Sequence, residues 1–143
     1  MSYRNRKEYK VYKKHTVKTQ KAGVCEFCKI TAGKDQFVEE TKSFKVIKNI
    51  FPYTYWDYRR VIEHLMIVPK KHIDTLDDIT ESEAAEYLQL LGGYESRGYD
   101  VFARAPDSVS RSVPHQHMHL IKPEKKPVRF LLYIKRPYLR IKF

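Results

Sequence analysis

The alternation of apolar and polar positions predicts a domain in which short strands outnumber helices. Residues 37–40 and 43–50 have the pattern of two strands joined by a turn, and residues 61–68 are apolar and prone to β structure until Pro69. Residues 99–104 are a further candidate strand. Short strands with short or helical connections predict an α+β domain with a mostly antiparallel sheet.

One main helix is predicted between these strands. Thr80 and Glu83 have the spacing of a capping box, in which each side chain satisfies a backbone N–H of the first turn. Apolar side chains follow at helical spacing, namely Ala84, Tyr87, Leu88 and Leu91. Gly98 is expected to end the helix, because glycine readily adopts the left-handed conformation found at helix ends.

The most distinctive stretch holds three of the six histidines at alternate positions, His115, His117 and His119. Residues 113–121 are interpreted as a strand, and alternate residues of a strand project from one face. The three imidazoles would then line one surface. Such a row can bind a metal ion, shuttle protons or attack a phosphorus centre. A merely polar strand is the alternative.

The net charge of +11 comes from the two ends of the chain. Residues 1–23 and residues 122–143 each contain eight Lys and Arg and one Glu, whereas residues 24–121 contain twelve basic and fifteen acidic residues. Basic ends that also carry tyrosines could bind nucleic acid by phosphate contact and stacking. A solvated, flexible arm over residues 1–22 is equally open. The domain would then span residues 23–143, with a basic tail over 122–143.

The rest of the composition favours an intracellular, cytoplasmic protein. No apolar run approaches the roughly 18 to 20 residues that a membrane span needs. The first ten residues lack the apolar region of a secretory signal. Cys25 and Cys28 are separated by two residues. In a reducing compartment this spacing indicates metal or redox chemistry before a structural disulfide.

Four segments in one order resemble the histidine triad (HIT) family of nucleotidyl hydrolases and transferases. They are residues 25–30 with the Cys-x-x-Cys pair, residues 46–52, residues 64–72 and residues 112–121. The resemblance spans about two thirds of the chain. It implies the HIT-like fold, with a mostly antiparallel five-stranded sheet, one main helix and short helices. It also implies a homodimer, because family members are commonly dimeric.

The resemblance assigns the chemistry to His117. This residue would attack the α-phosphorus of a nucleotide and form a covalent nucleotidyl-imidazole, which water or another acceptor then resolves. The ring nitrogen that does not attack must be held by an acceptor, and a backbone carbonyl is the expected one. His119 and Ser112 would contact the phosphate or the leaving group.

Other residues match the family's substrate-binding positions. Asn49 stands where many members place an acidic residue that binds the ribose hydroxyls, and Ile50 and Phe51 would flank the base. Arg111 replaces an amide side chain and could bind phosphate bidentately. His72 could reach the phosphates, or it could cap a turn.

Members with the Cys-x-x-Cys pair also imply a structural zinc ion. The expected ligands are Cys25, Cys28, His64 and His115, which form a tetrahedral set with no open position. Two reduced cysteines without a metal are the alternative.

The resemblance leaves the substrate open. Nucleoside 5′-phosphate derivatives such as dinucleoside polyphosphates or nucleoside phosphoramidates are the leading expectation, because residues 49–53 resemble the branch of diadenosine polyphosphate phosphorylases. Hydrolysis of adenylated or capped nucleic-acid ends is a second possibility, suggested by the basic ends. A non-catalytic, zinc-stabilised nucleotide-binding module is a third.

Overall fold

The computed structural model describes residues 2–4, 6–23, 25–108, 110–135 and 138–142. In chain order, its elements are β1 (Ser2–Tyr3), α1 (Arg6–Ala22), the 3-10 helix η1 (Phe27–Lys29), β2 (Phe37–Glu40), β3 (Phe44–Lys48), β4 (Tyr55–Trp56), β5 (Arg59–Pro69), the 3-10 helix η2 (Leu76–Asp78), α2 (Glu81–Glu95), β6 (Asp100–Ala103), β7 (Met118–Pro123), β8 (Leu131–Lys135) and β9 (Tyr138–Lys142).

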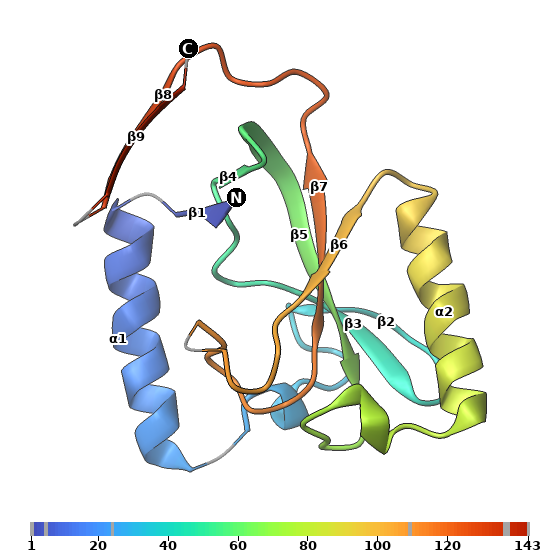
Figure 1. The fold of residues 1–143 in the computed structure, drawn as a ribbon. Helices are drawn as coiled ribbons and strands as arrows, with labels where there is room; N and C mark the ends of the chain where they lie inside the picture. The colour runs from blue at the N-terminus through green and yellow to red at the C-terminus, as the bar shows by residue number, and fades with distance from the viewer. Residues whose placement is uncertain (1, 5, 24, 109, 136–137, 143) are drawn as a thin grey trace.

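Five antiparallel strands form the central sheet in the order β2-β3-β5-β7-β6 (Figure 1). The long strand β5 organises it: residues 65–69 pair with β3, and residues 61–67 pair with β7. The start of β5 pairs with β4, which in turn pairs with β1. The predicted α+β fold with a mostly antiparallel sheet is confirmed, and β4 and β1 extend the five central strands to a seven-stranded sheet.

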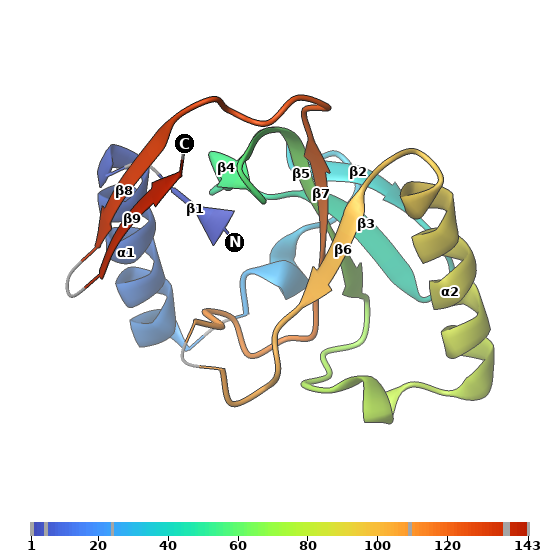
Figure 2. The same cartoon turned by 45° about the horizontal axis from the view of Figure 1, so that its top comes forward.

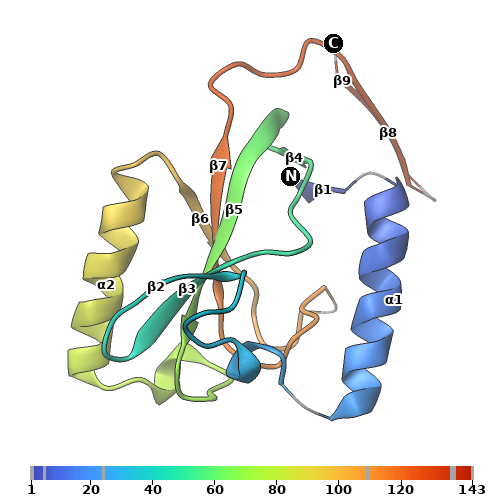
Figure 3. The same cartoon turned by 180° about the vertical axis from the view of Figure 1, so that it is seen from behind.

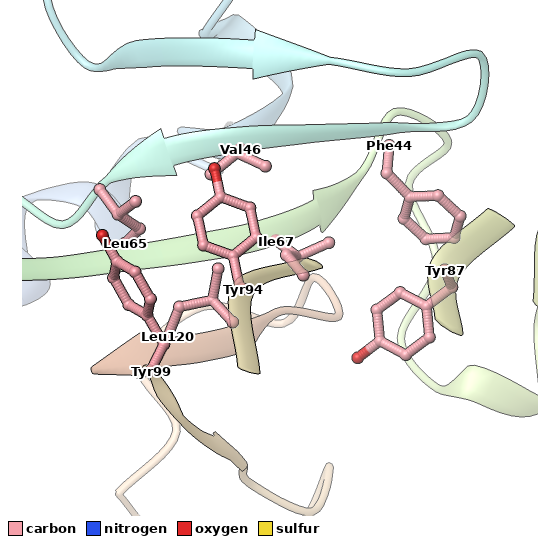
Figure 4. Packing of buried hydrophobic residues seen from close by; sticks show 8 residues of the cluster. All are labelled: Phe44, Val46, Leu65, Ile67, Tyr87, Tyr94, Tyr99 and Leu120. Carbon is pink, nitrogen blue, oxygen red and sulfur yellow. The ribbon is translucent and has the colours of Figure 1, made fainter. Parts of the chain in front are cut away.

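One face of the sheet packs against α2. Alternate residues of the strands, among them Val46, Ile67 and Leu120, are fully buried there against Tyr94 and Tyr87 of the helix (Figure 4). The predicted capping box begins α2: Thr80 accepts from the Glu83 N–H, and the Glu83 carboxylate accepts from the Thr80 N–H. Gly98, with φ of +84°, follows the helix end. The apolar burial fixes which residues face the other side.

The opposite face of β3 and β5 carries the Cys-x-x-Cys segment. Phe27 and Ile30 pack there on Ile47, Met66 and Val68. The side chain of Lys45 is also buried on this face, and its Nζ donates to the Phe27 and Ile30 carbonyls at 2.7 and 2.6 Å. Charge-assisted hydrogen bonds of this kind are strong. They hold the cysteine segment against the sheet.

Residues 6–22 form the helix α1, for which the sequence predicted no regular structure. α1 and α2 lie at opposite sides of the molecule (Figures 1 and 3). α1 packs on the segment after β3 through Glu8, which accepts from the Thr54 hydroxyl at 2.7 Å, and through the ring of Tyr12 on Phe51. The N-terminal segment therefore contacts the domain.

Two strands lie within the basic tail. β8 and β9 pair with each other as an antiparallel hairpin, which lies apart from the five-stranded sheet near α1 (Figure 2).

The histidine run differs from its prediction. β7 begins at Met118, so only His119 of the three histidines lies on a strand, while residues 113–115 form bends. All three side chains are nevertheless buried. The segment is anchored by its backbone, because the Gln116 N–H donates to the Ile73 carbonyl at 2.7 Å. His115, Gln116 and His117 are buried one after another, so the alternate spacing of the first two histidines does not mark a strand.

Among the described residues, none of the helices combines the length and apolar character that crossing a membrane would require.

Candidate functional site

His117 is held in one orientation by the chain itself. Its Nδ1 lies 2.8 Å from the carbonyl oxygen of His115, which can only accept. Nδ1 therefore carries the ring proton and donates, and Nε2 keeps its lone pair. The rings of Phe27 and His119 pack edge-on against the imidazole, with centroids 5.1 and 5.0 Å away. The expected backbone acceptor is thus present.

His119 faces His64 across the β5–β7 pair. Nε2 of His64 lies 2.9 Å from Nδ1 of His119, and the Tyr53 N–H donates to Nδ1 of His64 at 3.2 Å. Since Nδ1 of His64 accepts, its Nε2 carries the proton and donates to His119. Both rings are buried and neutral in this arrangement. Burial lowers the pKa of His64 to about 3 and that of His119 well below 6.5.

Burial also lowers the pKa of His117. The charges of Arg111 and Arg104 act in the same direction, and the hydrogen bond to the His115 carbonyl opposes them. A neutral imidazole with a free Nε2 lone pair is the nucleophilic form of histidine.

The structure gathers four candidate metal ligands, and they differ from the predicted set. Ligand atoms of Cys25, Cys28, His72 and His115 all lie within 4.8 Å of one another. His64, the predicted fourth ligand, is not in this group, and its ring is turned to His119. His72, predicted to contact substrate, instead has its Nδ1 at 3.3 Å from the Cys28 sulfur.

The geometry of this group fits a tetrahedral ion. Nδ1 of His115 lies 3.3 and 3.5 Å from the sulfurs of Cys25 and Cys28. With Zn–S near 2.3 Å and Zn–N near 2.0 Å, neighbouring ligand atoms of a tetrahedral site lie about 3.3 to 3.8 Å apart. Nε2 of His115 donates to the Pro69 carbonyl at 3.0 Å, which frees Nδ1. Ligating histidines are typically oriented by such an outer hydrogen bond.

The predicted nucleoside residues lie beside His64. The Asn49 side-chain amide is 3.2 Å from Nε2 of His64, and its Oδ1 accepts from the Phe51 N–H. Ile50 is exposed, and the Phe51 ring contacts the rings of Tyr12 and His15 of α1. A cavity of about 560 Å³ borders this region. Its lining includes Asn49 and His64 but not His117.

The loop before the histidine run brings in two arginines. Arg111, predicted to contact substrate, is 3% exposed, and its Nη2 lies 2.8 and 2.9 Å from the carbonyl and the carboxylate of Asp74. Ser112 follows it and is half-buried. Nη2 of Arg104 donates to the Tyr53 hydroxyl at 3.3 Å.

Two residues near the histidines were missed by the sequence interpretation. The guanidinium carbon of Arg4 lies 4.2 and 4.5 Å from the ring centroids of Tyr12 and Tyr53, and its Nε donates to the Phe51 carbonyl. Tyr53 is itself buried and packs on His64 and His119. Tyr12 and Tyr53 could be seen in the sequence, but their shared contact with Arg4 depends on how α1 packs on the domain.

Comparisons with known proteins agree on one family. The sequence profile of the HIT domain matches residues 31–126. A HIT-like protein of Chlamydia muridarum is 37% identical over 93 residues, covering 59% of this chain and 68% of that protein. The adenosine 5′-monophosphoramidase HNT1 of Candida albicans is 30% identical over 110 residues, covering 68% of each. The crystal structure of a HIT family hydrolase from Legionella pneumophila superposes with a TM-score of 0.52 at 25% identity, covering 71% of this chain and 95% of that one.

The buried, neutral His64 makes stability depend on pH. The unfolded histidine binds a proton below about 6.5, whereas the folded one stays neutral down to about 3. Stability is therefore full above the unfolded pKa and falls as the pH is lowered from 6.5 toward 3. We expect His64→Gln to reduce this loss by about 1.4 kcal/mol per pH unit between about pH 6 and pH 4.

Urea unfolding of both proteins at several pH values measures this difference. His15→Gln, which replaces a half-buried histidine of α1, controls for the loss of a histidine as such. Parallel curves of stability against pH for the wild type and His64→Gln would contradict the account.

Proposed function

Because the chain belongs to the HIT family, we propose that it is a nucleotidyl hydrolase or transferase that acts through a covalent intermediate on His117. The observation that supports this most is the hydrogen bond from Nδ1 of His117 to the His115 carbonyl, which leaves Nε2 as a fixed nucleophile. A nucleophile held by a third group is the general pattern of covalent catalysis.

In the proposed reaction, Nε2 of His117 attacks the α-phosphorus of a nucleoside 5′-phosphate derivative. The leaving group departs, and the His115 carbonyl stabilises the positive imidazole ring of the adduct through Nδ1–H. Water or another acceptor then releases the nucleotide. His119 lies edge-on to His117 and would contact the non-bridging oxygens or the leaving group, together with Ser112.

The nucleoside is proposed to bind on the side of Asn49, Ile50 and Phe51, and Asn49 also lines the cavity of about 560 Å³. Small-molecule sites typically have volumes of about 300 to 1,000 Å³. Dinucleoside polyphosphates and nucleoside phosphoramidates are the proposed substrates. A homodimer belongs to the same proposal on the family resemblance alone, and a cytoplasmic location belongs to it on the composition.

Replacing His117 with alanine should remove the activity. We expect kcat/KM for release of nucleoside monophosphate from diadenosine triphosphate to fall by about 10³-fold or more, since the nucleophile is lost. Affinity for adenosine monophosphate should remain within about threefold, because the nucleoside side is untouched. Chromatographic product analysis and calorimetry measure the two quantities.

Undiminished turnover by folded His117→Ala would refute the proposal. Nucleotide binding by the wild type without turnover of any such substrate would instead favour the non-catalytic alternative.

We further propose that a structural zinc ion binds Cys25, Cys28, His72 and His115. The set of two sulfurs and two nitrogens is one that zinc prefers, and with four protein ligands no position remains open for chemistry. The ion would link η1, the turn after β5 and the histidine run. Lys45 would help to hold the cysteine segment around the ion, since its Nζ donates to the Phe27 and Ile30 carbonyls.

Metal content should separate the two histidines considered for the fourth position. We expect His72→Gln to lose most of the bound zinc after dialysis against a chelator, and His64→Gln to keep about one ion per chain. Elemental analysis of the purified variants measures this. Loss of zinc from His64→Gln alone, or wild-type protein without zinc, would contradict the proposed site.

The position of α1 favours a second candidate function, the hydrolysis of modified nucleic-acid ends. Lys7, Lys10, Lys14 and Lys18 follow one another at intervals of three or four residues, so they form one stripe of the helix, and all four are exposed. The same helix contacts Phe51 beside the proposed nucleoside site through Tyr12. A strand whose end lay in the site could run along this stripe.

Neutralising the stripe tests this candidate. We expect Lys7, Lys14 and Lys18 replaced together by Gln to weaken binding of a 5′-adenylated oligonucleotide about tenfold or more and to flatten its salt dependence. Replacing the exposed Lys34, Lys42 and Lys125 by Gln gives the same change in charge as a control. Fluorescence anisotropy measures both. Equal binding by the two triple variants would rule out a role for the stripe.

A further inference from the structure

Arginine side chains from two parts of the chain surround the proposed reaction centre. Arg104 and Arg111 come from the loop before the histidine run, and Arg4 comes from the N-terminal segment. Burial lowers the pKa of His119, and the charges of Arg104 and Arg4 act in the same direction. Positive charge therefore lies near the centre before substrate binds, and the Asp74 carboxylate offsets only that of Arg111.

The guanidinium of Arg104 lies over the ring of Phe102, and that ring stacks on His119. Its guanidinium carbon lies 4.8 Å from the ring centroid of Phe102, and Phe102 stacks on His119 with centroids 5.3 Å apart and an interplanar angle of 18°. The hydroxyls of Tyr53 and Ser110 accept from its two terminal nitrogens at 3.3 and 2.5 Å. Because both partners are neutral, they orient the guanidinium without cancelling its charge.

The buried side chain of Arg111 has hydrogen-bond donors without a partner among the described residues. Its Nη2 binds Asp74, whose side chain is 55% exposed, but its Nε and Nη1 are buried and have no hydrogen-bond partner among the described residues, which leave out residue 109. Unpaired charged donors in the interior are costly, and an anionic acceptor would satisfy them.

The neighbouring histidines offer little proton to a leaving group. An amine must take up a proton as its bond to phosphorus breaks, whereas a phosphate departs as an anion. His64 and His119 are hydrogen-bonded to each other, buried and surrounded by positive charge, which all disfavour the imidazolium form. The neutral histidine pair and the nearby arginines favour a leaving group that is stabilised by positive charge rather than by protonation.

We propose that this site selects nucleotides whose leaving group is itself an anion, as in dinucleoside polyphosphates, and that Arg104 and Arg111 are specificity-determining residues. The inference rests on the proposed function. Nε2 of His117 forms the bond to phosphorus, and the P–O bond to the leaving nucleotide breaks with its electron pair, so the second nucleotide departs as an anion beside the guanidinium groups. Water then adds its oxygen to phosphorus, the P–N bond returns its pair to Nε2, and one proton is released.

The test compares two substrates that share the adenylyl group. Diadenosine triphosphate has an anionic leaving group, and adenosine 5′-phosphoramidate loses an amine. We expect the wild type to show a kcat/KM at least about tenfold higher for the first. Arg104→Gln and Arg111→Gln should each lower the ratio of the two kcat/KM values about tenfold or more. Arg97→Gln removes an equal charge at the end of α2 and should leave the ratio unchanged.

The outcomes are distinct. A wild type that prefers the phosphoramidate, or arginine variants that lose both activities in equal proportion, would overturn the inference while leaving the proposed function standing. No turnover of either substrate would overturn both. Thermal unfolding of each variant shows whether it is folded. Arg104 is half-buried, so its replacement should disturb the fold less than replacement of the buried Arg111 side chain.

Discussion

The antiparallel pairing of β5 with β7 is the contact on which the site depends. It places Met66 opposite His119 and His64 opposite Ile121, so the two imidazoles meet on the face of the sheet that α2 does not cover. The apolar residues between them, Leu65, Ile67 and Leu120, fix this register, because a slip by one residue would turn the histidines into the α2 interface. The core on one face therefore sets the chemistry on the other.

Each of the three histidines in the run has a different hydrogen-bond partner. His115 turns its Nδ1 to the cysteines because the carbonyl of Pro69, the last residue of β5, takes its other nitrogen. His117 turns its Nε2 away from the chain because the His115 carbonyl takes its Nδ1. His119 faces His64 from β7. Backbone carbonyls accept from His115 and His117, whereas His119 accepts from Nε2 of His64, so three chemically identical side chains are oriented by three different partners.

Much of this could be predicted from the sequence. The Thr80–Glu83 capping box and the apolar run of β5 predicted their elements correctly, because each pattern depends on residues within one helix or strand. His64 and His72 could not be told apart from the sequence, because His64 lies within β5 and His72 follows it, and only the direction of the chain after Pro69 brings His72 to Cys28. The helix α1 was missed because its contacts, such as Tyr12 on Phe51, are made with a segment far away in the sequence. The alternate spacing of the histidines suggested a strand, but His115 and His117 lie in a bent segment without strand pairing, where Gln116 between them is buried as well.

The claim that His117 attacks phosphorus is tested most directly by locating the intermediate. Wild-type protein mixed with diadenosine triphosphate is quenched within milliseconds in alkali, where phosphorus–nitrogen bonds of histidine survive, and its peptides are fragmented by mass spectrometry. The account predicts an adenylyl group on His117 and on no other residue of the run. Turnover without such an adduct, or an adduct carried by His119 or His64, would contradict it.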